Sequence, residues 1–536
     1  MRWDKPHLDS RTITQNQQQR GTVLFCDEMT SIKNYFITLC VSITFILIRQ
    51  TNSRPLNVVF IVLDDLRFFL HSEVDMPNIQ KYAGKGISFK NAFAQQALCA
   101  PSRNSILTGR RPDSLRLYDF YSYWRDEIAN FTTLPQFFKE QGYETRSYGK
   151  VFHPGQSSNF TDDYPYSWSQ KPYHAPTEIY KDAAVCRDPI TKELQANLIC
   201  PVRLKDQPGS SLPDIEIVNE SVRFLKSKNK SRPFFLAVGV HKPHIPLKFL
   251  RKYLAMVPMA SVKPPTFPTF PESVPIVAWH PWTDIRRRDD MKRLNISFPF
   301  GTMPPEWTLK IRQSYYAASL YVDALIGQLL KYVDKTNTVI VITSDHGWSL
   351  GENGMWAKYS NFDVALKVPL IFNIPETAPR VVDTPVELID IFPTILDLVN
   401  LNKDIPNCKG SNDRTLLCFE GKSLVSLMKG SQGKIEKAFA ISQYPRPSVY
   451  PEHNSDKPRL REIKIMGYSI RTKKYRYTEW ISFNSSLFTK DWNTIHGIEL
   501  YDHDMDPDES YNLFDCKTYL HTRKKLSKML RTQVNL

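Results

Sequence analysis

The sequence lacks the patterns that identify several large protein classes. It has no cysteine and histidine spacing of a zinc finger, no internal repeat and no long low-complexity linker. It also has no continuous basic helix, so nucleic acid is the least favoured partner despite a formal net charge of +15. This positive surplus also suits an anionic lipid, an acidic glycan or a diffusely basic surface, and charge alone does not choose between them.

Hydrophobic runs long enough for a comfortable membrane span are missing as well. The apolar run at 35–48 is shorter than the roughly 20 residues that a spanning helix needs. It follows Lys33 and precedes a polar stretch at 49–53, which is the pattern of a signal peptide. We therefore expect residues 1–54 to be an N-terminal extension and signal peptide, with the natural start at Met29 and no stable span after cleavage. A retained signal anchor is the alternative, because no clean cleavage site follows the run.

Cysteine is scarce, and its spacing indicates an oxidising compartment. Cys26 and Cys40 are among the 8 cysteines and lie in the N-terminal segment. The others comprise two closely spaced pairs and two single residues, namely Cys186 with Cys200, Cys408 with Cys418, Cys99 and Cys516. We expect both pairs to form disulfides, each stabilising a short loop by about 3 kcal/mol. An unpaired Cys99 then needs an explanation in a secreted protein.

Triplets of the form Asn-x-Ser/Thr support the same compartment. They occur at Asn130, Asn159, Asn219, Asn229, Asn295 and Asn484. A single triplet arises readily by chance, but several of them beside a signal peptide favour a secreted glycoprotein.

The order of apolar segments predicts an α/β fold. Continuous apolar runs, typical of strands buried on both faces, occur at 57–63, 233–240 and 338–343. Helical patterns such as 309–332 lie between them, so we expect a large, mostly parallel sheet sandwiched by helices. Acidic or histidine residues follow each run, and ligands bind beyond the carboxyl ends of such strands. These polar side chains should therefore converge.

The pattern changes after about residue 430. Short alternating strands follow, for example at 468–471 and 475–478. We expect a large α/β domain at 55–430 and a smaller α+β domain at 431–536 that contains a short antiparallel sheet.

Acidic residues at two strand ends suggest a metal site. Asp64 and Asp65 follow the first apolar run, and Asp345 follows the run at 338–343. An isolated Asp-Asp pair more often faces solvent, but a third acid at another strand end would repel the pair unless a cation lies between them. Oxygen-rich sites select Ca²⁺ or Mg²⁺. The adjacent His346 is a less usual ligand for calcium.

Cys99 lies at the predicted start of a helix. Pro101 suits the first helical position and Gly109 suits its end. Backbone N–H groups at such a start favour an anion. A buried structural cysteine and a thiolate nucleophile are both compatible with this position.

The segment Cys99-Ala100-Pro101-Ser102-Arg103, with Leu107-Thr108-Gly109-Arg110 after it, resembles the signature of the sulfatase family. Asp64-Asp65 and Asp345-His346 resemble the metal strands of that family, and 499–502 resembles its C-terminal pattern. Longer stretches resemble the members that act on 2-O-sulfated iduronate, at 91–96, 109–113, 117–120, 149–155, 356–363 and 442–448.

The resemblance implies a covalent mechanism. A formylglycine-generating enzyme would oxidise Cys99 to formylglycine during secretion, the hydrated aldehyde would attack sulfur, and its second hydroxyl would then expel sulfate. The resemblance also implies one Ca²⁺ ion, with ligands from Asp64, Asp65, Cys99, Asp345 and His346. Many relatives have asparagine at the position of His346, so the identity of the metal is the weaker inference.

The resemblance further assigns roles to basic residues. Arg103 would orient the nucleophile, Lys150 and Lys358 would bind sulfate oxygens, His244 would protonate the leaving oxygen and His153 would act as a base. Each residue alone has a plainer interpretation, because single lysines are usually solvated and single histidines are more often structural.

The implied function is removal of 2-O-sulfate from L-iduronate in heparan sulfate and dermatan sulfate, in lysosomes or outside the cell. The Lys358-Tyr359 pair is the expected contact for the uronate carboxylate. Another glycosaminoglycan or aryl sulfatase is the alternative. A phosphodiesterase of the same superfamily would usually place Ser or Thr at position 99, and a non-catalytic glycan-binding protein would not need the intact set of site residues.

Overall fold

The structure is a computed structural model that describes residues 54–68, 73–188, 191–402, 404–430 and 438–535. The expected signal peptide and its start at Met29 lie outside these residues. Residues Leu56–Leu536 form one structural unit, and the expected boundary at residue 430 meets the undescribed segment 431–437, so it stays a prediction. Within the described part of the chain, no helix combines the length and the apolar character needed to cross a membrane.

An 8-stranded sheet forms the centre of this unit, in the order β13-β2-β12-β9-β1-β7-β3, with β14 also paired to β2. The strands are β1 (Asn57–Asp64), β2 (Ile87–Phe93), β3 (Glu144–Gly149), β7 (Phe234–Pro243), β9 (Thr338–Ser344), β12 (Lys367–Asn373), β13 (Arg380–Val382) and β14 (Val386–Glu387). Every pairing is parallel except the two made by β12. The expected mostly parallel sheet is confirmed.

Strand β1 occupies an inner position because its side chains are apolar on both faces. Val59 pairs with Leu236 of β7 on one side and with Ile340 of β9 on the other. All three are at most 1% exposed. Burying each such side chain stabilises the folded state by about 1.5–3 kcal/mol. This packing holds β1 between β7 and β9.

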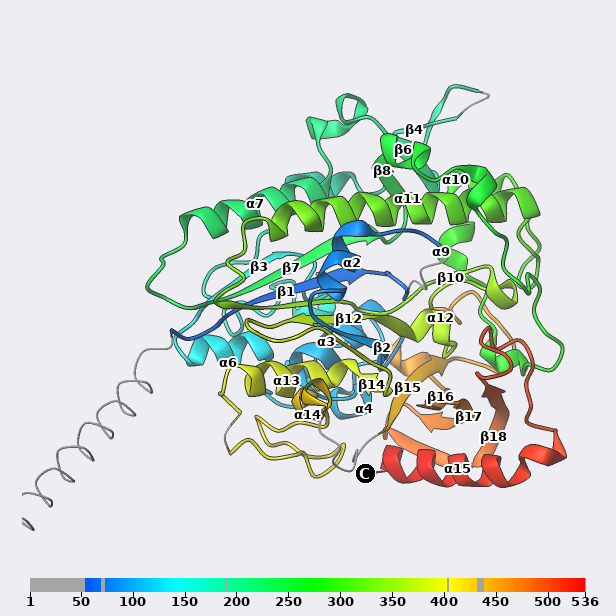
Figure 1. Ribbon diagram of the computed structural model, residues 1–536. Helices are drawn as coiled ribbons and strands as arrows, with labels where there is room; N and C mark the ends of the chain where they lie inside the picture. The colour runs from blue at the N-terminus through cyan, green and yellow to red at the C-terminus, as the bar shows by residue number, and fades with distance from the viewer. Residues whose placement is uncertain (1–53, 69–72, 189–190, 403, 431–437, 536) are drawn as a thin grey trace, which may run out of the picture. The chain divides into compact units, whose positions relative to one another are not determined.

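Helices cover both faces of the sheet (Figure 1). Helices α7 (Pro213–Ser227) and α11 (Pro305–Leu330) lie on one face, and α3 (Cys99–Thr108), α6 (Leu134–Glu140) and α13 (Ile391–Leu398) lie on the other. Helices α6, α7 and α11 each have a proline in their first turn, where the missing N–H breaks no hydrogen bond.

Shorter elements connect these layers. The helices are α2 (Pro77–Ala83), α4 (Pro112–Leu115), α5 (Trp124–Glu127), α8 (Lys252–Ala255), α9 (Thr283–Arg286), α10 (Asp289–Lys292), α12 (Asp363–Leu366) and α14 (Val425–Lys429). The strands are β4 (Cys186–Arg187), β5 (Leu194–Gln195), β6 (Ile199–Val202), β8 (Leu247–Leu250), β10 (Ser349–Leu350) and β11 (Trp356–Ala357).

The C-terminal part contains the expected antiparallel sheet. Its strands are β15 (Phe439–Arg446), β16 (Ile465–Thr472), β17 (Tyr475–Asn484) and β18 (Thr489–Asp502), paired in sequence order. Helix α15 (Leu520–Asn535) packs on this sheet and buries Leu526, Leu530 and Val534.

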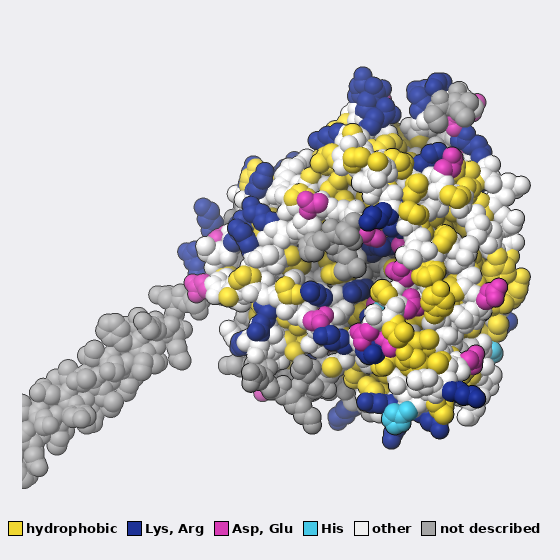
Figure 2. All heavy atoms as spheres, turned by 45° about the vertical axis from the view of Figure 1, so that its right-hand side comes forward, with side chains coloured by type: hydrophobic (Ala, Val, Ile, Leu, Met, Phe, Trp, Pro, Cys, Tyr) yellow, Lys and Arg dark blue, Asp and Glu magenta, His cyan; other side chains and the backbone are white. Residues whose placement is uncertain are grey.

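Helix α15 also corrects one expectation, because it is a basic helix. Its cations are Arg523, Lys524, Lys525, Lys528 and Arg531, and no acidic residue lies between them. Leu526 and Leu530 interrupt these cations in the sequence, so the segment does not look continuously basic. In the helix both leucines lie on the buried side. On the face drawn in Figure 2, lysine and arginine side chains are dispersed among acidic and apolar ones.

Both expected disulfides are present. Cys186 is bonded to Cys200 and Cys408 to Cys418. Cys99 is free and buried, and Cys516 is free and exposed.

Candidate active site

The acidic residues converge at the carboxyl edge of the sheet because β1 and β9 are parallel neighbours. Leu63 pairs with Ser344, so the residues that follow each strand meet. The backbone N–H of Asp65 donates to Oδ1 of Asp345 at 3.1 Å. Asp64, Asp65 and Asp345 are at most 1% exposed, and they offer carboxylate oxygens that lie within 4.8 Å of one another.

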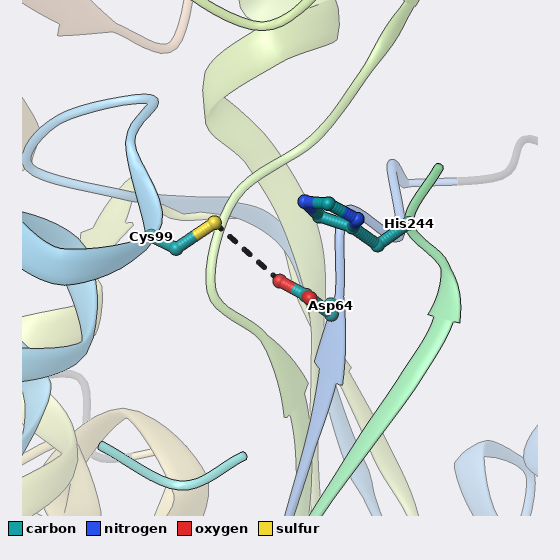
Figure 3. A group of neighbouring side chains, drawn as sticks. All are labelled: Asp64, Cys99 and His244. Atoms are coloured by element: carbon teal, nitrogen blue, oxygen red, sulfur yellow. Dashed lines mark hydrogen bonds between the residues drawn. The ribbon is translucent and has the colours of Figure 1, made fainter. Parts of the chain in front are cut away.

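Cys99 lies beside these acids at the first residue of α3. Its Sγ is 3.5 Å from Oδ1 of Asp64 and 3.3 Å from Nε2 of His346. In Figure 3 the side chains of Cys99, Asp64 and His244 surround one small space. The helix begins at Cys99 rather than at Pro101 as expected, so Cys99 itself occupies the N-terminal turn.

Arg103 and Lys150 hold the acids from one side. The guanidinium of Arg103 reaches Asp345 through Nε at 2.8 Å and Asp64 through Nη2 at 3.2 Å. Nζ of Lys150 lies 2.7 Å from Oδ2 of Asp64. Burial alone would raise the pKa of Asp64, but the charges of Lys150 and Arg103 hold it well below its usual value.

Lys358 approaches from the other side. Its Nζ lies 2.7 Å from Oδ1 of Asp65 and 3.0 Å from Sγ of Cys99. Even with this partner, burial and the charge of Asp64 raise the pKa of Asp65 to about 7. Oδ2 of Asp65 is buried and makes no hydrogen bond within the described residues. Oδ2 of Asp65 therefore lacks a partner in the described part of the chain, and a bound cation would supply one.

His244 follows β7 and faces the acids. Its Nδ1 lies 2.6 Å from the carbonyl of Ile245, which can only accept, so Nδ1 carries the hydrogen. Nε2 is then the nitrogen directed at the site, 3.8 Å from Oδ2 of Asp65. Burial lowers the pKa of His244 well below its usual value. The nearby His241 lies within β7 and pairs instead with Glu178 at 3.0 Å.

His153 lies at the edge of the same site. Its ring packs 4.5 Å from the ring of Phe120, centroid to centroid. Nδ1 of His153 is buried without a hydrogen bond in the described part of the chain. Burial and the charge of Lys150 lower the pKa of His153 well below its usual value, so this imidazole is neutral near pH 7.

Tyr359 does not have the surroundings that the sequence suggested. Its hydroxyl donates to a carboxylate oxygen of Asp284, and the side chain is buried. Nζ of Lys457 binds the same carboxylate at 2.6 Å. Because the hydroxyl is already engaged, this geometry argues against the expected contact between Tyr359 and a substrate carboxylate.

A pocket beside the acids contains polar residues that the sequence did not single out. Asp64, Lys150, His153 and His244 form its inner end. The rest of its lining includes Glu178, Lys181, Lys242, Lys248 and Asp214. These residues come from the segments 178–181, 214 and 242–248, which are far apart in the sequence and are brought together only by the tertiary fold.

Comparisons with known proteins agree with this geometry. The family model described as Sulfatase matches residues 56–401. The iduronate 2-sulfatases of Homo sapiens and Mus musculus are each 46% identical to this chain over 511 residues, which covers 87% of it and 92% of each relative. A phosphonate monoester hydrolase from Silicibacter pomeroyi has a similar fold, with a TM-score of 0.66 at 22% identity, over 90% of this chain and 96% of that one. The chain belongs to the sulfatase family of hydrolases.

Proposed function

We propose that this chain hydrolyses the 2-O-sulfate ester of L-iduronate residues at the ends of heparan sulfate and dermatan sulfate chains. The supporting observation is the 46% identity, over 511 residues, to relatives named iduronate 2-sulfatase. Another glycosaminoglycan sulfatase or an aryl sulfatase would share the same central groups. The distinction between these substrates therefore depends on the pocket around the sulfate rather than on the acids below it.

The proposed metal ion is one Ca²⁺, held by Asp64, Asp65, Asp345 and His346. Three buried carboxylates within 4.8 Å suit a hard cation, and the unbonded Oδ2 of Asp65 supplies a free ligand atom. Cys99, in its modified form, would add an oxygen. When bound, the cation would withdraw charge from the sulfate oxygens and acidify the attacking hydroxyl.

Conversion of Cys99 to formylglycine by a formylglycine-generating enzyme is proposed as the source of the nucleophile, which the hydrated aldehyde would supply. Two features support this: Cys99 forms no disulfide, and it lies at a helix start beside buried cations. Arg103 donates to Asp64 and Asp345 and to the carbonyl of Lys150. It would fix the acids around the nucleophile and keep them ionised.

The remaining basic groups bind the substrate and move the proton. A sulfate placed against Cys99 would meet the ammonium groups of Lys150 and Lys358, which act as point charges. Nε2 of His244 faces the same space and would donate a proton to the leaving sugar oxygen. Burial disfavours protonated His244, but a bound anionic sulfate and an acidic solution both favour it. His153, neutral at the pocket edge, would accept a proton in the second step.

An acidic, lumenal compartment, the lysosome, is the proposed location. Both disulfides fit an oxidising route of synthesis. The asparagine of every Asn-x-Ser/Thr triplet is exposed, as glycosylation requires: Asn130, Asn159, Asn219, Asn229, Asn295 and Asn484. The proposed partner is a sulfated glycosaminoglycan.

The test is sulfate release by the purified, secreted protein from defined disaccharides. We expect hydrolysis of terminal 2-O-sulfated iduronate, faster at pH 5 than at pH 7, and no turnover by Cys99→Ala. Mass spectrometry of the peptide that contains residue 99 should show formylglycine in active protein. Faster cleavage of a 6-O-sulfated glucosamine would overturn the proposed substrate, and an unmodified thiol in active protein would overturn the proposed nucleophile.

A further inference from the structure

The pocket beside the acids is small, and several lysines line it. It measures about 260 Å³, close to the lower limit of about 300–1,000 Å³ that is usual for small-molecule sites. This size suits one or two sugar residues rather than a long chain. Apart from Lys150, its lining includes Lys181, Lys242 and Lys248, and these three ammonium groups differ in how many of their donors are already engaged.

Two of the three lysines are occupied by backbone carbonyls. Nζ of Lys242 donates to two carbonyls of the loop that carries His244. Nζ of Lys248 donates to the carbonyl of Tyr180 at 2.9 Å and to that of Lys181 at 3.1 Å. Both ammonium groups therefore hold the walls of the pocket and have few donors left for a ligand.

The nearby acids are occupied as well. Glu178 is bonded to His241 at 3.0 Å, and Asp214 accepts the backbone N–H of His241 at 2.6 Å. Asp182, the neighbour of Lys181 in the sequence, forms an ion pair with Arg288 at 2.6 Å. These three acids are therefore bonded to His241 and Arg288, and none of them is bonded to Lys181 in the described part of the chain.

Lys181 differs from the other two lysines in the surroundings of its ammonium group. No hydrogen bond or ion pair engages its Nζ within the described residues. Lys181 lines the same pocket as Lys150 and His244. Partial loss of solvent and the charge of Lys150 lower the pKa of Lys181. An anion that enters the pocket would relieve this repulsion between cations.

We propose that Lys181 binds a second anionic group of the substrate, either the uronate carboxylate or a sulfate on the adjoining sugar. This proposal rests on the proposed function, since that substrate brings a second anion close to its 2-sulfate. An ammonium makes charge-assisted hydrogen bonds to either group, and burying the anion without a partner would be unfavourable. Lys248 is a positioning residue here, because it binds the carbonyl of Lys181 itself.

The experiment compares Lys181→Gln with Lys171→Gln, a matched change at an exposed lysine outside the pocket lining. Three substrates separate the sources of the second anion. A neutral aryl sulfate has none, an aryl iduronide 2-sulfate has only the carboxylate, and a disaccharide with a sulfated glucosamine has both groups. Steady-state KM and kcat are measured for each.

We expect Lys181→Gln to raise KM for a doubly anionic substrate about tenfold more than for the aryl sulfate, the effect of one charge-assisted hydrogen bond. Lys171→Gln should show no such difference, and Lys181→Arg should recover most of the affinity. An effect on the aryl iduronide assigns Lys181 to the carboxylate, and an effect confined to the disaccharide assigns it to the adjoining sulfate.

Two other outcomes would contradict the role of Lys181 and the proposed function, respectively. Equal changes of KM on all three substrates, or no change on any, would overturn the role of Lys181 while the wild-type protein still hydrolyses both uronates. Failure of the wild-type protein to hydrolyse either uronate, with turnover of the aryl sulfate, would overturn the proposed function instead.

Discussion

Nη2 of Arg446, the last residue of β15, donates to the backbone carbonyl of Tyr359 at 2.8 Å. The same guanidinium reaches the carbonyl of Val277 through Nε at 3.0 Å, and its side chain is 1% exposed. Tyr359 follows Lys358 directly. The C-terminal sheet therefore fixes the turn that places Lys358 against Asp65.

Replacing Arg446 by lysine should weaken catalysis without touching the catalytic groups. A lysine cannot serve carbonyls in several directions at once, because its donors radiate from one atom. We expect kcat/KM for the 2-sulfated uronate to fall about tenfold and the free energy of unfolding to fall by about 1–3 kcal/mol. Arg223→Lys, at a surface ion pair, is the control. Unchanged kinetics in Arg446→Lys would mean that the turn does not depend on this contact.

Replacing Tyr359 by phenylalanine should affect charged and neutral substrates alike. The hydroxyl of Tyr359 binds Asp284, so its loss would loosen the turn beside Lys358 rather than remove a substrate contact. We expect KM for an aryl iduronide 2-sulfate and for a neutral aryl sulfate to change by the same factor. A selective rise for the iduronide would instead restore Tyr359 as a carboxylate ligand.

The sequence was sufficient to predict which residues meet at the acids. Continuous apolar runs predicted β1 and β9 as buried strands, and parallel pairing brings their carboxyl ends together. Asp64, Asp65 and Asp345 stand at or just after the ends of these strands, so the pairing of Leu63 with Ser344 brings them close together. Cys99 could be added because a short signature defines its helix start.

Side-chain directions in turns could not be predicted in the same way. Lys358 and Tyr359 are neighbours in sequence, yet one points to Asp65 and the other to Asp284. The backbone at Tyr359 has φ +58°, a left-handed conformation that no periodic pattern announces. Lys181 escaped notice for a related reason, because its importance depends on what Lys242 and Lys248 already bind.

Removal of the Cys186–Cys200 disulfide tests the anchoring of the pocket wall. The bond closes a loop with a sequence separation of 14 and joins β4 to β6, and β6 pairs with β8, which carries Lys248. We expect the double Ala variant to lose about 3 kcal/mol of unfolding free energy, measured by urea denaturation. Cys516→Ala, at an exposed free cysteine, should have no effect. An equally stable double variant would show that packing alone holds this wall.

The side chain of His174 joins two acids, Asp162 and Glu178, and Glu178 lines the pocket. Nε2 lies 2.6 Å from Asp162 and Nδ1 lies 3.1 Å from Glu178. Burial opposes protonation of His174, but these hydrogen bonds raise its pKa to about 10. Burial likewise opposes ionised Glu178, but its hydrogen bonds to His174 and His241 hold its pKa below the usual value. The charged pair is therefore the stable form in acid.

The pH dependence of this pair has a definite sign. His174, with a raised pKa, contributes its full stability below about pH 6.5 and loses it as the pH rises towards 10. Glu178, with a lowered pKa, contributes above about pH 4.5 and loses its effect in stronger acid. The joint contribution is therefore greatest between about pH 4.5 and 6.5, the range of an acidic lumenal compartment. We expect His174→Gln to lower Tm most in this window, with the difference from wild type shrinking steadily towards pH 10. Thermal denaturation at a series of pH values measures it, with His521→Gln on the exposed side of α15 as the control. A deficit in Tm that stays constant from pH 5 to pH 10 would show that His174 acts by packing rather than by its charge.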